Sequence, residues 1–125
     1  MNQNWTRVAA ILGLIGVGLG AFGAHRLKDI ASEKQLALWH TATLYHLLHV
    51  APLLVLDRGP QRPGLRLAGR AFLVGIGVFS GTLYAMALGA PSRLGAITPL
   101  GGVALMVGWG ALAYASTART ADRVQ

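Results

Sequence analysis

The stretch VAAILGLIGVGLGAFGAH, residues 8–25, contains no Asp, Glu, Lys or Arg over 18 consecutive positions. Three further charge-free stretches follow it: residues 35–56 and 71–92, with 22 positions each, and residues 94–118, with 25. A helix needs about 20 mostly apolar residues to cross a bilayer core of about 30 Å, and only helices or closed barrels satisfy their backbone in lipid. Because strand alternation is absent, the sequence predicts four transmembrane helices.

The predicted fold is an all-α membrane bundle that occupies one domain, residues 1–125. We expect its helices at residues 5–24, 36–56, 68–88 and 99–118. Ser32 and Gln35 form a capping-box pattern just before the second helix. Pro52 lies inside that helix and predicts a kink there.

Composition supports a membrane protein. Of 125 residues, 54% are hydrophobic and only 12% are charged, whereas a soluble domain carries about 25% charged residues. The chain contains no cysteine, which excludes disulfides, thiolate metal sites and Cys nucleophiles. The net charge of +7 could instead serve nucleic-acid binding, but no basic face or aromatic platform remains outside the predicted helices, so we expect no nucleic-acid partner.

Basic residues divide unequally between the two predicted sides. One side carries seven arginines and the other carries two arginines and two lysines. These are Arg7, Arg58, Arg62, Arg66, Arg70, Arg119 and Arg123 against Arg26, Lys28, Lys34 and Arg93. The positive-inside rule therefore predicts a multi-pass protein of a bacterial-type plasma (inner) membrane with both termini in the cytoplasm.

Two other interpretations of the first helix are weighed against this one. Arg7, the apolar run and Ala21-Phe22-Gly23 resemble a cleavable secretory signal, although the run is long for one. Gly18, Gly20 and Gly23 fit the dinucleotide pattern GxGxxG, but no strand precedes them and position 43, about 20 residues on, is Thr rather than an acid. We expect neither cleavage nor nucleotide binding.

Small residues recur at a spacing of four, which aligns them on one helix face. We expect helix packing at Gly16 and Gly20 in the first helix, at Gly77 and Gly81 in the third, and at Gly108 in the fourth. Small residues let helix backbones approach closely in lipid. The rows fit either a tight bundle within one chain or a contact with a second copy or another membrane protein.

Histidines mark the polar part of the second helix. His46 and His49 share one face, and His46 lies at the midpoint of residues 36–56. An ionisable side chain at the bilayer centre faces the bundle and suggests function. From their similar depth we expect His46 to bond Ser80, and His40 to meet Tyr84. His25 lies at the outer end of the first helix. Trp5 and Trp39 are expected as interfacial anchors.

These polar residues allow three functions. Neutral histidines could join helices by hydrogen bonds, ligate a metal or haem, or carry protons or ions. No carboxylate lies in any predicted span, so we expect no catalytic residues and no metal or other cofactor. The candidate polar face comprises His25, His46, His49, Ser80 and Tyr84.

The same residues resemble a known family. The motifs are GAFGAH at residues 20–25, Trp39 with Ala42, Tyr45 and His49, FSGTLY at residues 79–84, ITPLGG at residues 97–102, and Gly108-Trp109. Together they resemble family 423 of the domains of unknown function, and they are similar to eukaryotic transmembrane protein 256. The resemblance implies a four-helix integral membrane protein and no particular chemistry.

We therefore expect a non-enzymatic structural or accessory component whose partner is the lipid bilayer. The alternative is a small transporter or channel, or a metal- or haem-binding membrane protein, that uses the face of His46 and His49. An acid or a broken helix pair near the midplane would favour transport. The sequence offers only the Pro52 kink.

Overall fold

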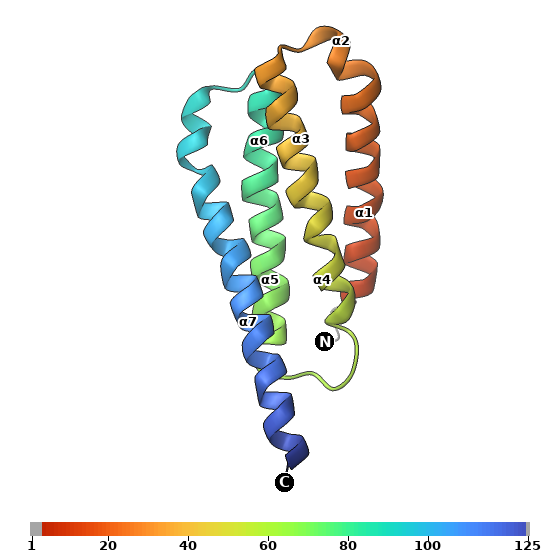
Figure 1. Cartoon of the computed structure of the whole chain (residues 1–125), viewed down its shortest axis with the longest axis vertical. Coiled ribbons are helices and arrows are strands. Elements are labelled where there is room, and N and C mark those ends of the chain that lie inside the picture. The colour runs from red at the N-terminus through yellow and green to blue at the C-terminus, as the bar shows by residue number, and fades with distance from the viewer. Residues whose placement is uncertain (1–3, 125) are drawn as a thin grey trace.

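The chain folds into four antiparallel helical segments that run side by side along one axis (Figure 1). This computed structural model describes residues 4–124, and side chains only to residue 117. The first segment comprises α1 (Trp5–Phe22), the π-helical turn η1 (Gly23–Leu27) and α2 (Lys28–Ile30). The second comprises α3 (Glu33–Leu48) and α4 (Val50–Val55). α1 begins and α7 ends at the same end of the bundle (Figure 1).

The third segment comprises α5 (Leu65–Gly75), the π-helical turn η2 (Ile76–Ser80) and α6 (Gly81–Ala87). The fourth comprises the 3-10 turn η3 (Ser92–Ala96) and the long helix α7 (Thr98–Val124). Each helical segment packs on the next one along the chain. The all-α prediction is confirmed for the described residues.

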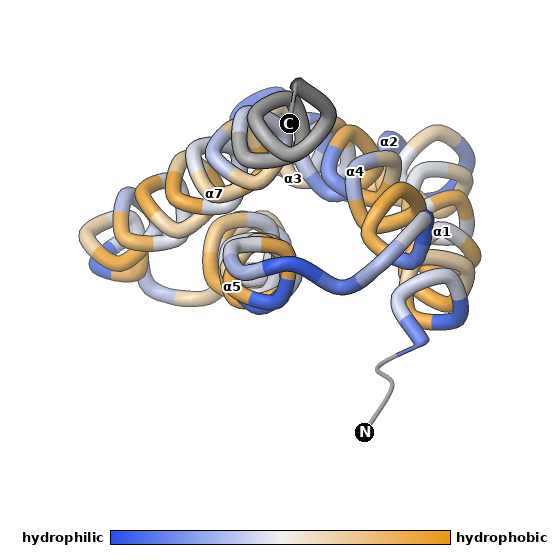
Figure 2. Tube along the Cα trace, turned by 90° about the horizontal axis from the view of Figure 1, so that it is seen from below, coloured by the Kyte–Doolittle hydropathy of each residue, from blue (hydrophilic) through white to orange (hydrophobic). Residues whose placement is uncertain are grey.

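Among the residues that the structure describes, three stretches are long and apolar enough to cross a membrane: Trp5–Ile30, Leu65–Ala87 and Ser92–Thr117. Their outer faces carry large exposed hydrophobic side chains, such as Leu14 and Met106. Figure 2 shows hydrophobic residues along all of the helices, as expected where lipid replaces water.

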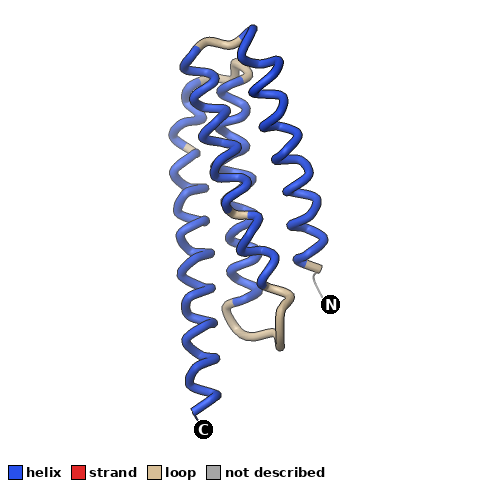
Figure 3. Tube along the Cα trace, turned by 45° about the vertical axis from the view of Figure 1, so that its right-hand side comes forward, coloured by secondary structure: helices blue, strands red, loops and turns tan. Residues whose placement is uncertain are grey.

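The second segment is interrupted at His49, so neither α3 nor α4 alone has a membrane-spanning length. Pro52 follows three residues later and has no backbone N–H for the carbonyl of residue 48, which its ring also crowds. His49 adopts φ −92° and ψ −1° at the break, which Figure 3 marks as a short non-helical patch within the segment. The predicted kink is present at this break.

Local signals set the ends of the segments. The predicted capping box is confirmed, because Ser32 Oγ accepts from the Gln35 N–H and Gln35 Oε1 accepts from the Ser32 N–H. The Thr6 N–H donates to Asp57 Oδ2 at 2.6 Å, so the residue that follows the second segment caps the first turn of α1. Gly64 adopts φ +95°, a left-handed conformation that favours glycine, and α5 starts directly after it.

Two clusters form the core. The larger surrounds Phe72 and includes Trp5 and Leu53, and the smaller joins Trp39, Leu27 and Ala87. The expectation that Trp5 and Trp39 are interfacial anchors is wrong, because each is only 2% exposed. Their rings lie where the neighbouring helix has a glycine instead of a side chain: Trp5 covers Gly69 and Trp39 covers Gly23.

The predicted glycine packing is confirmed in the first and fourth segments. A Cβ added at Gly16 would come within 2.5 Å of the Leu47 side chain, one at Gly20 within 3.4 Å of Thr43, and one at Gly108 within 2.7 Å of Phe72.

The prediction is wrong for packing within the chain at Gly77 and Gly81, where an added Cβ would meet nothing within 4 Å. The third segment instead packs through other glycines, including Gly75 against Leu105. Lipid is as apolar as a helix neighbour, so a small-residue row does not reveal which way it faces.

Candidate functional site: a histidine-centred polar network

His46 lies near the middle of the bundle and is 4% exposed. Its Nε2 is 2.9 Å from the Leu12 carbonyl oxygen and its Nδ1 is 3.2 Å from the Tyr84 hydroxyl. Because a carbonyl can only accept, Nε2 carries the proton and donates it to Leu12. His46 thereby joins the second segment to the first and to the third.

The hydrogen bonds of His46 continue through Tyr84 to a second hydroxyl. The Tyr84 hydroxyl donates to Thr43 Oγ1 at 3.2 Å, and each hydroxyl carries one proton. In that arrangement His46 Nδ1 needs a proton of its own to bond the Tyr84 oxygen. In the opposite arrangement, with His46 neutral, Tyr84 would donate to Nδ1 and accept from Thr43. The direction of this short chain therefore depends on the charge of His46.

His49 occupies the break between α3 and α4 and is 6% exposed. Its Nε2 accepts from the Trp109 indole N–H at 3.1 Å, and its Nδ1 lies 2.6 Å from the Tyr45 carbonyl oxygen. An indole N–H can only donate and a carbonyl can only accept, so these partners select the neutral tautomer with the proton on Nδ1. His49 joins the second segment to the fourth.

Aromatic rings surround His49. The ring centroids of Phe72 and Trp109 lie 5.9 and 5.8 Å from that of the imidazole, and 5.3 Å from each other. Tyr45 stacks on the imidazole, with the two ring centroids 6.1 Å apart. This environment offers one polar partner for each ring nitrogen and is otherwise apolar.

The predicted pairing of His46 with Ser80 is wrong. Ser80 is buried as expected, but its Oγ donates to the Ala42 carbonyl at 2.8 Å. The predicted meeting of His40 with Tyr84 is also wrong, since His40 is exposed and Tyr84 bonds His46 and Thr43. Both observed pairs, His46 with Tyr84 and Ser80 with Ala42, differ from the predicted pair by four residues, which is about one helical turn. The predicted faces therefore meet, but the relative axial position of the second and third segments was wrong.

His25 is not part of the network. It lies in η1 and is exposed. Within residues 4–124 the structure holds no group of three or more His, Cys, Asp or Glu that could bind a metal ion. The polar face predicted from sequence is therefore divided into the His46–Tyr84 pair, His49, Ser80 and the separate His25.

Two participants were missed by sequence reasoning. Thr43 shares the His46 face at helical spacing, and a hydroxyl there could have been included in the network. Trp109 is 48% exposed, but its ring packs on Phe72 and its indole N–H donates to His49. The requirement that an indole N–H find an acceptor was the available signal.

Three membrane-capable helices, an apolar outer surface and an internal polar network define a helical membrane protein. The chain belongs to the family described as "Protein of unknown function (DUF423)", whose family model matches residues 19–102. The resemblance stated from the sequence motifs is thus confirmed.

Curated relatives extend from bacteria to yeast. The UPF0382 membrane protein YwdK of Bacillus subtilis is 43% identical over 82% of this chain and 86% of its own length. A UPF0382 membrane protein of Haemophilus influenzae is 36% identical over 93% of this chain and 95% of its own. The UPF0382 membrane protein C1782.12c of Schizosaccharomyces pombe is 37% identical over 82% and 92%. No solved structure matches the chain.

Proposed function

We propose that the chain crosses the plasma membrane four times, with both termini in the cytoplasm. Three helices have the required length and apolarity, and the broken second segment runs antiparallel between the first and the third. A break inside a protein bundle is tolerated in a membrane where neighbouring helices satisfy the freed backbone groups. The excess of arginine at the end where α1 begins supports the orientation.

Reporter fusions test this topology. Fusions at Gly64 and after Gln125 should both give a cytoplasmic signal, and a fusion at Gly89 should give an external one. An external signal at Gly64 or after Gln125 would contradict the proposed orientation.

We propose that the protein is a non-enzymatic structural or accessory component of the membrane. One observation carries this proposal: His46 and His49 tie the second segment to all three others. Their partners outside the second segment are Leu12 in the first, Tyr84 in the third and Trp109 in the fourth. All four ring nitrogens have a protein partner, which is the arrangement that stabilises a bundle.

A pair of substitutions at His49 tests the structural role. Gln has an amide that can donate to one partner and accept from the other, whereas Leu has neither group. We expect His49→Gln to keep most of the stability in detergent and His49→Leu to lose about 1 kcal/mol. His40→Leu is the matched control, because His40 lies exposed on the same segment. Equal stability of the two His49 variants would contradict the structural role.

A small proton transporter is the second candidate. The chain from His46 through Tyr84 to Thr43 favours it, since a proton at Nδ1 reverses the direction of both hydrogen bonds. If the protein carries protons, the His46→Gln variant should fold normally, and proteoliposomes that contain it should show no proton flux. Unchanged flux would remove this candidate.

Metal or haem ligation by the same histidines is the weaker alternative. A metal ion or haem iron bound to His49 Nε2 must displace the Trp109 N–H. One bound to His46 Nδ1 must displace the Tyr84 hydroxyl. Bound metal or a Soret band in the purified protein, lost in the two His→Gln variants, would support it.

An accessory role also implies a partner in the membrane, either a second copy or another membrane protein. The exposed Gly77 and Gly81 leave open space on the third segment for a closely packed helix. Cysteine crosslinking from Gly77→Cys in this cysteine-free chain tests that contact, and a product of twice the chain mass would indicate a second copy.

A further inference from the structure

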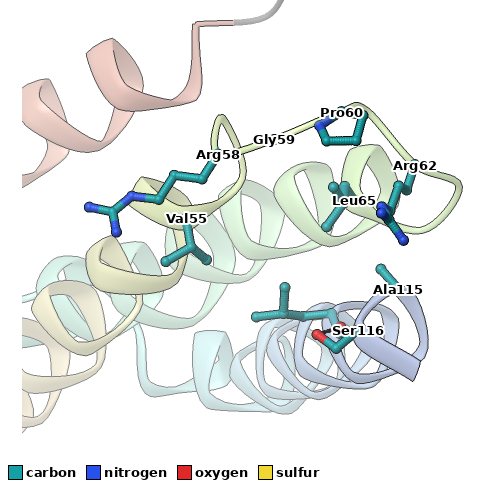
Figure 4. Close-up of a pocket in the computed structure, with 9 residues that line it drawn as sticks. Val55, Arg58, Gly59, Pro60, Arg62, Leu65, Ala115 and Ser116 are labelled. Atoms are coloured by element: carbon teal, nitrogen blue, oxygen red, sulfur yellow. Dashed lines mark hydrogen bonds between the residues drawn. The ribbon is translucent and has the colours of Figure 1, made fainter. Parts of the chain in front are cut away.

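A cavity of about 470 Å³ opens at the end of the bundle where α1 begins. The loop between α4 and α5 forms one side of it, and the late turns of α7 form the other (Figure 4). Ligand pockets in proteins commonly occupy about 300–1,000 Å³. Gly64 holds the loop against α7, because a Cβ there would lie 3.2 Å from the Ala111 carbonyl oxygen. The loop and α7 therefore approach each other closely beside the cavity.

Arginines border this cavity. Arg58 and Arg62 line it, and Arg62 also lines a neighbouring pocket of about 340 Å³ with Arg66. The loop appears as a hydrophilic strip in Figure 2. Its one acid, Asp57, directs a carboxylate oxygen to the Thr6 N–H at the start of α1. The two lysines of the chain, Lys28 and Lys34, belong to the opposite end of the bundle.

Guanidinium groups favour phosphate. Their planar fork can donate two parallel hydrogen bonds to phosphate oxygens, which an ammonium group cannot. Basic pockets between membrane helices on the cytoplasmic side are typical sites for anionic lipid headgroups.

Apolar side chains separate the two arginines. Arg58 and Arg62 stand at opposite ends of the cavity with Val55 and Leu65 between them (Figure 4), and Leu112 completes the apolar wall. A free phosphate ion would leave this wall uncovered. A phospholipid carries its phosphate next to a glycerol and acyl chains that can cover apolar surface.

We propose that this cavity binds the phosphate-bearing headgroup of an anionic phospholipid. Arg58 and Arg62 supply the positive charge, and Val55, Leu65 and Leu112 contact the apolar part of the lipid. The site ties the loop between the second and third segments to the inner leaflet. Its placement in that leaflet rests on the topology proposed above, whereas binding itself does not.

Lipid titration of the full-length protein in non-ionic detergent tests the proposal. The protein should bind phosphatidylglycerol at least about tenfold more tightly than phosphatidylcholine. Both affinities are obtained by counting lipid adducts in native mass spectrometry. The Arg58→Gln/Arg62→Gln variant should lose about tenfold in phosphatidylglycerol affinity. The matched control is Arg26→Gln/Arg93→Gln, which removes two exposed arginines from the other end and should stay within about twofold of the wild type.

Each alternative outcome is decisive. Equal losses in the two double variants would overturn the site in favour of general charge attraction. Inorganic phosphate that binds as tightly as phosphatidylglycerol and displaces it would overturn the lipid assignment in favour of a soluble phosphate compound. If Arg62→Gln impairs folding, the test uses Arg58→Gln alone, because the Arg58 side chain is exposed. This variant should bind phosphatidylglycerol about threefold more weakly than the wild type. An unchanged affinity would overturn the proposal. Detergent imposes no orientation, so this test can fail while the topology stands.

Discussion

The contact between the third and fourth segments differs in kind from the contacts that the second segment makes with its neighbours. Between the third and fourth, glycines bring backbone and side chains into direct contact: Gly101 lies against the Phe79 backbone, Gly75 against Leu105, and Gly108 against Phe72. The second segment also packs against glycines of the first, at Gly16 and Gly23. It differs in adding His46 and His49, which bond the other three segments.

The difference follows from the solvent. Lipid gives helices no hydrophobic reason to associate, so close van der Waals packing and hydrogen bonds must hold them together. The long α7 can supply a continuous row of contacts to α5 and η2. The second segment is broken at His49 and has a shorter regular surface, so directional bonds add to its packing.

The largest effect is expected from filling a glycine contact. Gly101→Leu places a large side chain against the Phe79 backbone, which cannot move aside as a flexible side chain can. We expect a loss of about 3 kcal/mol in unfolding free energy, measured by thermal unfolding in detergent. Gly81→Leu is the control on the open face and should change stability by about 0.5 kcal/mol or less. Comparable losses in both variants would mean that the two faces do not differ.

An intermediate effect is expected from removing the central hydrogen bonds. His46→Leu eliminates the bonds to Leu12 and Tyr84, which should cost about 2 kcal/mol. Tyr84→Phe removes one of these bonds and should cost about 1 kcal/mol. A His46→Leu protein as stable as the wild type in the same unfolding assay would show that packing alone holds the second segment.

The smallest effect is expected at the end of the second segment, where Asp57 caps α1. Partial desolvation raises the pKa of the Asp57 carboxyl, but hydrogen bonds from the Thr6 N–H and hydroxyl and from the Trp5 N–H outweigh it, so the net pKa is lowered from its ordinary value of 3.8. The cap therefore stabilises the folded chain above the ordinary pKa, and this stability is lost as the pH falls through the lower folded-state pKa.

Asp57→Asn should cost about 0.5 kcal/mol at neutral pH, because the amide oxygen still caps the helix without its charge. Unfolding curves from pH 7 down to about pH 3 should converge for the variant and the wild type at the acid end. A constant difference across that range would contradict the cap.

Sequence patterns predicted the helical segments well and their contacts unevenly. The charge-free stretches form helical segments, Ser32 forms the capping box, and the second segment is interrupted close to Pro52. They depend on neighbours within one or two helical turns, which the sequence contains directly. Predicted ends differ by a few residues, for example Leu65 instead of residue 68 for the third segment.

Predictions that required the orientation of a helix were less successful. The sequence left open whether Gly77 and Gly81 pack within the chain, and they have no neighbour there. Trp5 and Trp39 were placed at interfaces and are buried. The π-helical turn η2 within the third segment also changes the angular relation between residues on its two sides. Nothing in a regular spacing count signals such a turn.

The sequence by itself determined that this is an all-helical membrane protein, because long charge-free stretches leave the backbone no other way to satisfy its hydrogen bonds in lipid. It also predicted polar residues inside the bundle, correctly for His46, His49 and Ser80 but not for His25, which is exposed. Only the tertiary structure decided that His46 pairs with Tyr84 and Leu12, and His49 with Trp109. In water an apolar stripe points a helix toward the core, but in lipid every face is apolar, so rotation and partner choice emerge only when the helices pack.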